Sequence, residues 1–213
     1  MMANAASTSS SASNPVQKKA KVAASPWQNV LKQYLDSPEK HPEAVVTTTD
    51  EMVLIHDAFP KAKHHYLALP RSSNPLHSNS EGVAALTKSD QHLLAAFLKT
   101  FTQVQQAYPQ ITFKAGFHAV PSMAHLHMHI ISDDMVSPAL KNKKHWNSFT
   151  TRFFIPLETV VTRIEKDGSI EIDKEEYEQL LKGPLVCHKC QKTIKNIPEL
   201  KKHLDVHLEK DAQ

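Results

Sequence analysis

Short apolar runs, several of which alternate with polar residues, recur between residues 45 and 132. Such period-two or compact apolar runs predict β-strands, because successive side chains of a strand point to opposite faces. The predicted strands are residues 45–48, 52–57, 65–69, 112–118 and 125–132. Short polar or proline-containing turns separate the first three, which indicates an antiparallel sheet.

One longer segment, residues 89–108, has apolar side chains with a helical period, and Pro109 follows it. Its apolar stripe consists of Leu93, Leu94, Phe97, Leu98, Phe101 and Val104. A second helix is expected over residues 27–35, with Ser25 as its cap and Pro26 in its first turn. Together the elements predict an α+β fold in which an antiparallel sheet carries helices on one side.

The last predicted strand places His125, His127 and His129 at every second position. An extended strand would turn all three imidazoles to one face, about 6 to 7 Å apart, and the apolar residues between them to the other. Two chemistries use such a row. One is metal chelation, but no carboxylate follows at ligand spacing, since Asp133 and Asp134 come after the alternation ends. The other is nucleophilic phosphoryl chemistry on the neutral central imidazole.

Near the other end, Cys187, Cys190, His203 and His207 have the spacing of a two-cysteine, two-histidine zinc finger. The two histidines are one helical turn apart, and Ile194 and Leu200 occupy the positions of a small apolar core. Four protein ligands close the coordination sphere, so the sequence predicts one structural zinc ion per chain. Lysines spread through the finger suit contact with a phosphate backbone.

Composition and charge limit the possible classes. The chain has 213 residues, 40% hydrophobic content and a formal net charge of +3. Two closely spaced cysteines are no disulfide framework, which favours a reducing compartment, and no apolar run resembles a signal peptide or a membrane span. Residues 141–152 are basic and residues 165–178 are rich in acids. A short basic cluster at residues 15–22 is a candidate nuclear address.

Composition shifts divide the chain into four parts. Residues 1–25 are predicted as a disordered tail and residues 26–165 as the domain that carries the histidines. Residues 166–182 are predicted as a connecting segment, and residues 183–210 as the finger. We expect a monomer that does not bind membranes.

Four segments resemble motifs of the aprataxin family, within the histidine triad superfamily. They are residues 59–63, 116–123 and 137–149 and the finger, and the resemblance extends from about Trp27 to His207. It implies a histidine triad fold followed by a ββα zinc finger. It also implies a nuclear DNA-repair hydrolase that removes AMP from 5′-adenylated DNA ends left by abortive ligation. Family members with a phosphopeptide-binding forkhead-associated domain carry it ahead of the catalytic domain, and we expect no room for one before Trp27.

The resemblance assigns roles to individual residues. His127 would be the nucleophile that carries AMP, with its other ring nitrogen donating to a backbone carbonyl, and no catalytic metal is expected. His125 and His129 would bind phosphate oxygens, while His118, Ser122 and Lys144 would hold the phosphates and the DNA end. Asp57 would accept hydrogen bonds from the ribose. The other expected substrate contacts are Lys61, Lys63, Met123, Leu54 as an adenine-pocket wall or ordinary core, and Trp27 as a wedge or ordinary core.

Three functions remain open at this point. The first is the DNA 5′-adenylate hydrolase, acting on nicked or double-stranded DNA, with RNA–DNA junctions as a further candidate substrate. The second is a small-nucleotide hydrolase that cleaves adenosine phosphoramidates or dinucleoside polyphosphates. The third is a non-enzymatic, zinc-dependent DNA-binding module. The basic segment at residues 141–152 and the finger favour the first, because a small nucleotide needs neither.

Overall fold

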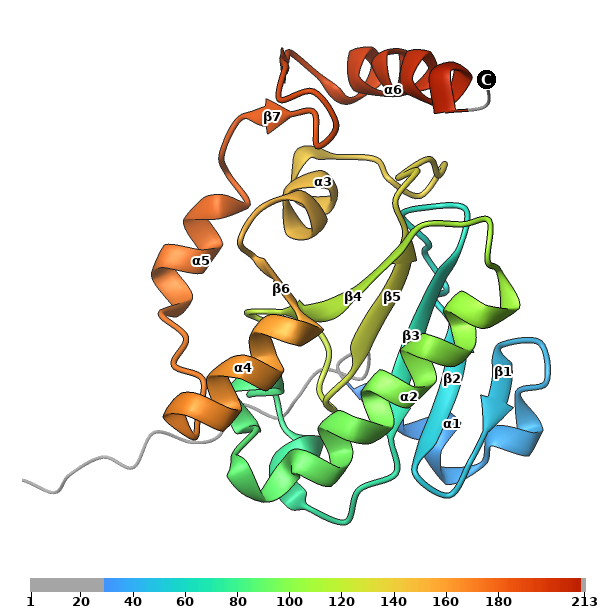
Figure 1. Ribbon diagram of the computed structural model, residues 1–213, viewed down its shortest axis with the longest axis vertical. Coiled ribbons are helices and arrows are strands. Elements are labelled where there is room, and N and C mark those ends of the chain that lie inside the picture. The colour runs from blue at the N-terminus through green and yellow to red at the C-terminus, as the bar shows by residue number, and fades with distance from the viewer. Residues whose placement is uncertain (1–28, 212–213) are drawn as a thin grey trace, which may run out of the picture.

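A six-stranded antiparallel sheet forms the centre of the computed structural model, which describes residues 29–211 (Figure 1). The strand order is β1-β2-β3-β5-β4-β6. The strands are β1 (Val45–Thr48), β2 (Met52–His56), β3 (His65–Pro70), β4 (Phe113–His118), β5 (Met128–Ser132) and β6 (Phe154–Pro156). The expected tail at residues 1–25, the basic cluster within it and Trp27 lie outside the described residues.

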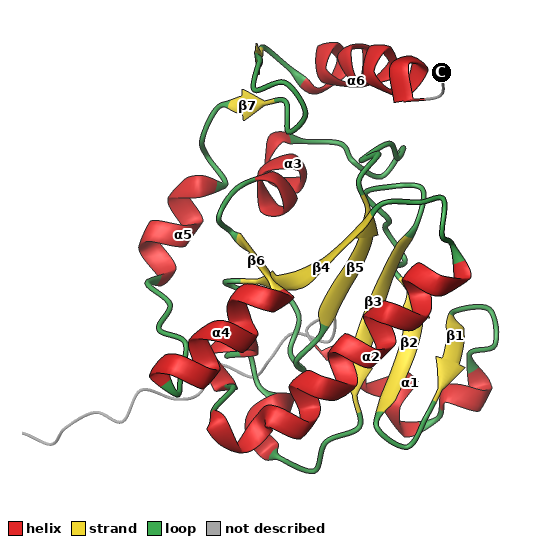
Figure 2. Ribbon diagram, in the orientation of Figure 1, coloured by secondary structure: helices red, strands yellow, loops and turns green. Residues whose placement is uncertain are grey.

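Two long helices cover one face of the sheet and cross in front of it in Figure 2. They are α2 (Gln91–Ala107) and α4 (Leu157–Asp167). A capping box between Thr87 and Asp90 precedes α2, and α4 ends at Gly168 in the left-handed conformation that glycine tolerates best. Their apolar faces pack on side chains such as Leu54, Met128 and Ile130, which share this face of the sheet.

The prediction of helices on one side only is wrong, because two further helices lie against the opposite face. The first, α1 (Lys32–Asp36), is shorter than expected and starts later; Leu31, just before it, packs with Val53 and Leu67. The second, α3 (Lys143–Thr150), packs through Trp146 and Phe149 beside Ile131. Alternation along the strands directs these sheet residues away from α2, so this face needs its own cover.

The finger consists of β7 (Leu185–Val186), β8 (Thr193–Ile194) and α6 (Ile197–Asp211), and it sits beyond α3 at the end of the sheet (Figure 1). It shares one apolar cluster with the sheet domain, here residues 29–167. Finger residues Leu185, Cys187, Ile194, Leu200 and Leu204 pack with Ile131, Met135, Leu140 and Trp146 of that domain. The finger therefore buries its apolar residues against the sheet domain and does not form a separate core.

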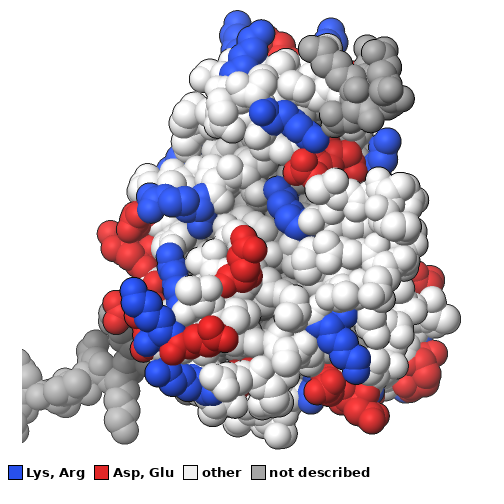
Figure 3. All heavy atoms as spheres, in the orientation of Figure 1, with Lys and Arg blue, Asp and Glu red and all other residues white. Residues whose placement is uncertain are grey.

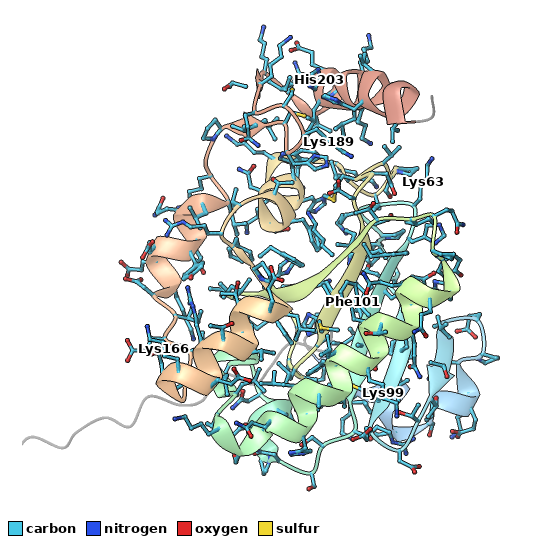
Figure 4. The ribbon with its side chains drawn as sticks, in the orientation of Figure 1. Lys63, Lys99, Phe101, Lys166, Lys189 and His203 are labelled. Atoms are coloured by element: carbon cyan, nitrogen blue, oxygen red, sulfur yellow. The ribbon has the colours of Figure 1, made fainter. Side chains whose placement is uncertain are left out.

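Polar contacts fasten the same junction. The indole N–H of Trp146 donates to the Val186 carbonyl at 2.9 Å, and the Lys201 ammonium donates to the Ser137 carbonyl at 3.0 Å. Lys189 pairs with Asp133 at 3.2 Å and lies between the finger and the sheet domain (Figure 4).

Residues 166–182 also pack on the sheet domain. Ile170 belongs to the core beneath α2, Tyr177 of α5 (Lys174–Leu180) packs against it, and Leu181 is buried. No helix among residues 29–211 is long and apolar enough to span a membrane.

Candidate functional site

A cavity of about 690 Å³ opens on the sheet face opposite α2 and collects most of the polar residues singled out above. Its floor comes from strand residues, namely His65 of β3, His118 of β4 and His129 of β5, together with His127 just before β5. The register explains why they meet, since β5 lies between β3 and β4 and His129 pairs with Leu67 on one side and with Gly116 on the other.

His127 has the geometry of a nucleophile. Its Nδ1 atom lies 2.8 Å from the His125 carbonyl oxygen, which can only accept a hydrogen bond. Nδ1 must therefore carry the proton, and Nε2 keeps its lone pair. Burial lowers the pKa of His127, although the contact with the His125 carbonyl and the Asp57 charge oppose the shift. The ring is accordingly neutral at physiological pH.

His125 does not share the strand face with the other two histidines. Strand β5 begins only at Met128, and His125 adopts a left-handed conformation with φ 69°. Its side chain lines a separate cavity of about 390 Å³, next to Lys32 and Ser72. The prediction of three imidazoles in one row is wrong here, because the chain turns before the strand starts. What His125 offers to His127 is its backbone carbonyl.

A chain of hydrogen bonds sets the orientation of His129. The Lys61 backbone N–H donates to Nδ1 of His65 at 3.2 Å, so the proton of neutral His65 sits on Nε2. That Nε2 lies 3.0 Å from Nδ1 of His129 and donates to it. His129 must then carry its own proton on Nε2, which is buried without a hydrogen-bond partner among the described residues. A substrate oxygen would satisfy this donor.

The same tautomers argue against a metal ion between Asp57, His65 and His129, whose donor atoms lie within 4.8 Å of one another. A metal would need the lone pair of His65 Nε2, which would place a proton on Nδ1, facing the Lys61 N–H. Burial also lowers the pKa of His65 to about 4 and that of His118 and His129 well below the usual value. The cluster is thus a set of neutral hydrogen-bonding groups.

Charged and aromatic side chains surround the mouth of the cavity. Lys61, Lys144 and Lys182 supply positive charge, and Phe59 is 72% exposed at the rim. Asp57 accepts a hydrogen bond from the Phe59 N–H at 2.7 Å. The arrangement suits a ligand that combines phosphates with flat rings.

The finger brings Cys187, Cys190, His203 and His207 together, with all four donor atoms within 4.8 Å of one another. Cys190 Sγ and His203 Nε2 are 3.2 Å apart, Cys187 Sγ and His207 Nε2 are 3.6 Å apart, and the two Nε2 atoms are 3.2 Å apart. Tetrahedral zinc with ordinary bond lengths separates its ligands by about 3.3 to 3.8 Å. Both the donor set and its geometry fit one structural zinc ion.

Comparison with known proteins agrees with both parts of this structure. Residues 29–145 match the family described as "Scavenger mRNA decapping enzyme C-term binding", and residues 150–210 match the "C2HE / C2H2 / C2HC zinc-binding finger". An aprataxin-like protein of Saccharomyces cerevisiae is 33% identical over 209 residues, covering 84% of this chain and 95% of that protein. The chain belongs to the aprataxin family.

Other aprataxins support the assignment. Aprataxin of Danio rerio is 40% identical over 185 residues, which is 85% of this chain but 54% of that protein, so the chain spans about half of that relative. The crystal structure of the aprataxin ortholog Hnt3 from Schizosaccharomyces pombe superposes with a TM-score of 0.71 at 29% identity, covering 85% of this chain and 92% of that one. Hnt3 in complex with DNA gives a TM-score of 0.70 at 28% identity, with coverages of 87% and 96%.

Most residues that the aprataxin resemblance assigned to the site line the cavity. They are His127, His129, His118, Asp57, Ser122, Met123, Lys144 and Lys61. Two others do not. Leu54 is buried under α2 on the opposite face, and Lys63 is exposed before β3, where its backbone N–H donates to Asp134 at 3.0 Å (Figure 4).

Several other residues line the cavity but were not assigned to it from the sequence. His65 and Phe149 line the floor, and Lys182 and Glu178 come from the segment predicted as a connection. His65 lies two residues after the 59–63 motif and Phe149 ends the 137–149 motif, so these two positions could have drawn attention. The others depend on how α3 and α5 pack, which local patterns do not reveal.

Proposed function

We propose that this aprataxin-family protein is a DNA-repair hydrolase that removes AMP from 5′-adenylated DNA ends. The proposal rests mainly on the state of His127. This buried imidazole is neutral, and the lone pair of its Nε2 atom is free at the floor of a cavity that has lysines at its rim. Phosphoryl transfer depends on positioning and on stabilising negative charge, and this cavity offers neutral donors and cations for both.

In the first step Nε2 of His127 attacks the phosphorus of AMP. A nitrogen–phosphorus bond forms, and the bond from that phosphorus to the oxygen of the DNA 5′-phosphate breaks. The leaving phosphate has a last pKa near 6, so it departs without a strong general acid. His129 Nε2–H would donate to a non-bridging oxygen, and Lys61 and Lys144 would offset the negative charge.

In the second step water attacks the same phosphorus. Its oxygen bonds to phosphorus, the bond to Nε2 of His127 breaks, and AMP leaves. One proton of the water passes to the freed Nε2 and then to solvent, and the other stays on the phosphate of AMP until that group ionises. The Nδ1–H contact with the His125 carbonyl persists throughout and keeps Nε2 as the reacting atom. Asp57, at the rim of the cavity, is proposed to accept hydrogen bonds from the ribose.

The finger is proposed to hold the DNA backbone. Lys192, Lys195 and Lys202 are exposed on it, and such lysines bind phosphates without reading bases. The zinc ion would act only by keeping the finger folded. The face that carries α2 and α4 shows cations and acids interspersed (Figure 3), whereas the cavity with Lys61, Lys144 and Lys182 opens on the opposite face of the sheet. We further propose that the protein acts as a nuclear monomer.

The test compares AMP release from a synthetic 5′-adenylated nick, from an adenylated RNA–DNA junction and from an adenosine phosphoramidate. We expect a higher kcat/KM on the adenylated nick than on the adenosine phosphoramidate. The ratio of the two kcat/KM values should fall as the salt concentration rises. A higher kcat/KM on the phosphoramidate, unchanged by salt, would identify a small-nucleotide hydrolase instead. DNA binding without AMP release from any substrate would leave only a binding module.

A further inference from the structure

The peptide group between His125 and Leu126 keeps the proton of His127 on Nδ1, and a second hydrogen bond, to the backbone of His77, orients this peptide group. The carbonyl of the peptide between His125 and Leu126 accepts the Nδ1–H of His127 at 2.8 Å. The N–H of the same peptide donates to the backbone carbonyl of His77 at 2.6 Å. Because carbonyl and N–H point in opposite directions across a planar peptide, the His77 contact determines which end faces His127.

His77 is anchored through its side chain. It lies in a short 3-10 turn, Pro75–Ser78, in the segment between β3 and α2. Its imidazole is buried, with Nε2 3.2 Å from Asp90 Oδ1 and Nδ1 2.8 Å from the Ser72 hydroxyl. Asp90 is also buried and also accepts the Thr87 N–H at 2.8 Å in the capping box that precedes α2.

The contacts form a continuous path from α2 to the reacting atom. Asp90 fixes the imidazole of His77, which places the His77 carbonyl; the carbonyl orients the peptide, and the peptide selects the tautomer of His127. His77 itself does not line the catalytic cavity; it lines the separate cavity beside His125. The strained left-handed backbone of His125 requires such a support, because an unsupported residue would relax to a commoner conformation.

We infer that His77, held by Asp90, is a positioning residue that keeps the His127 proton on Nδ1 and so leaves Nε2 free to attack. The inference rests on the proposed function, in which His127 is the nucleophile. Without the support, the peptide can rotate and present its N–H to Nδ1, which would favour the opposite tautomer and remove the lone pair from the attacking position.

The experiment uses the full chain with zinc bound and three variants. His77→Ala removes the anchor, His77→Gln restores an N–H that can reach Asp90, and Thr87→Ala weakens the same cap without touching His77. Two readouts are taken. Steady-state AMP release gives kcat and KM on the adenylated nick, and long-range ¹H–¹⁵N spectra report which nitrogen of His127 carries the proton.

We expect His77→Ala to lower kcat by roughly 10- to 100-fold, the range seen for groups that orient metal-binding histidines, with KM little changed. His127 should then show a mixture of tautomers. His77→Gln should recover much of kcat, and Thr87→Ala should resemble the wild type in both readouts. If His77→Ala fails to fold, His77→Gln and Asp90→Asn carry the same comparison.

A His127 tautomer that is unchanged in a folded His77 variant would overturn the inference, as would a fall in kcat no larger than that of Thr87→Ala. Failure of the proposed function looks different. In that case the wild-type protein itself releases no AMP from the nick, while the spectra still report whether His77 controls the tautomer.

Discussion

Replacing Leu200 with alanine tests whether the finger and the catalytic cavity share one core. Leu200 is on α6 with 0% of its side chain exposed, and it packs in the cluster that includes Trp146. Removing a fully buried leucine side chain costs roughly 2 to 5 kcal/mol. At about 2 to 4 °C per kcal/mol for a chain of this size, the Tm should fall by about 4 to 20 °C.

The destabilisation caused by Leu200→Ala should also affect the catalytic cavity. Trp146 is on α3, and Lys144 and Phe149 of the same helix line the cavity. A finger that unfolds would uncover Trp146 and loosen α3. From the sequence alone, loss of the finger is expected to spare turnover of an adenosine phosphoramidate, whereas the shared core predicts that turnover on this substrate and on adenylated DNA falls together.

The assay follows unfolding by tryptophan fluorescence and by circular dichroism, with phosphoramidate turnover measured along the same temperature series. Val206→Ala is the matched control, because Val206 is on the same helix but 50% exposed, and its effect should stay within about 0.5 kcal/mol. Two separate transitions, with phosphoramidate turnover following only the later and unshifted one, would refute the shared core.

Three other changes have defined outcomes. His127→Ala should reduce AMP release by several powers of ten and leave DNA affinity nearly intact; retention of more than about a tenth of the turnover would contradict its role as nucleophile. His65, with its pKa lowered to about 4, binds a proton in the unfolded chain before it does so in the folded one. The free energy of unfolding should thus fall by up to about 3 kcal/mol as pH drops from 6.5 toward 4. Urea denaturation of His65→Gln should show a shallower pH dependence, and equal slopes would disprove this. Gly116→Ala would bring a Cβ atom to 2.4 Å from the Ile155 carbonyl, so thermal melting should reveal a loss of about 1 to 3 kcal/mol or more; an unchanged Tm would show that β6 can shift freely.

The sequence predicted the elements that have a strong local pattern. The strands from β1 to β5 and the helix α2 appear within a few residues of their expected bounds, because apolar periodicity specifies them. The four zinc ligands converge as their spacing predicted. The family and its fold also followed from short motifs, and the comparisons confirmed both.

The remainder depends on contacts between distant parts of the chain. Strand β6 has only three residues and forms because it pairs with β4. Such a short segment has no apolar periodicity from which a strand could be predicted. The sequence does not reveal the turn at His125, because the polar and apolar alternation of His125, Leu126 and His127 continues the alternating pattern of strand β5. The junction between Trp146 and Leu200 joins segments whose local patterns are complete without it, which made the finger look like an appended module.

In the proposed mechanism, His127 forms a covalent bond to AMP taken from a DNA end. The most direct measurement mixes the enzyme with a nick whose AMP is radiolabelled, quenches the reaction in alkali within a turnover, and maps the label by peptide mass spectrometry. We expect transient AMP on the peptide that contains His127, and no label in His127→Ala. Steady AMP release without labelled protein, or a label on another residue, would contradict it.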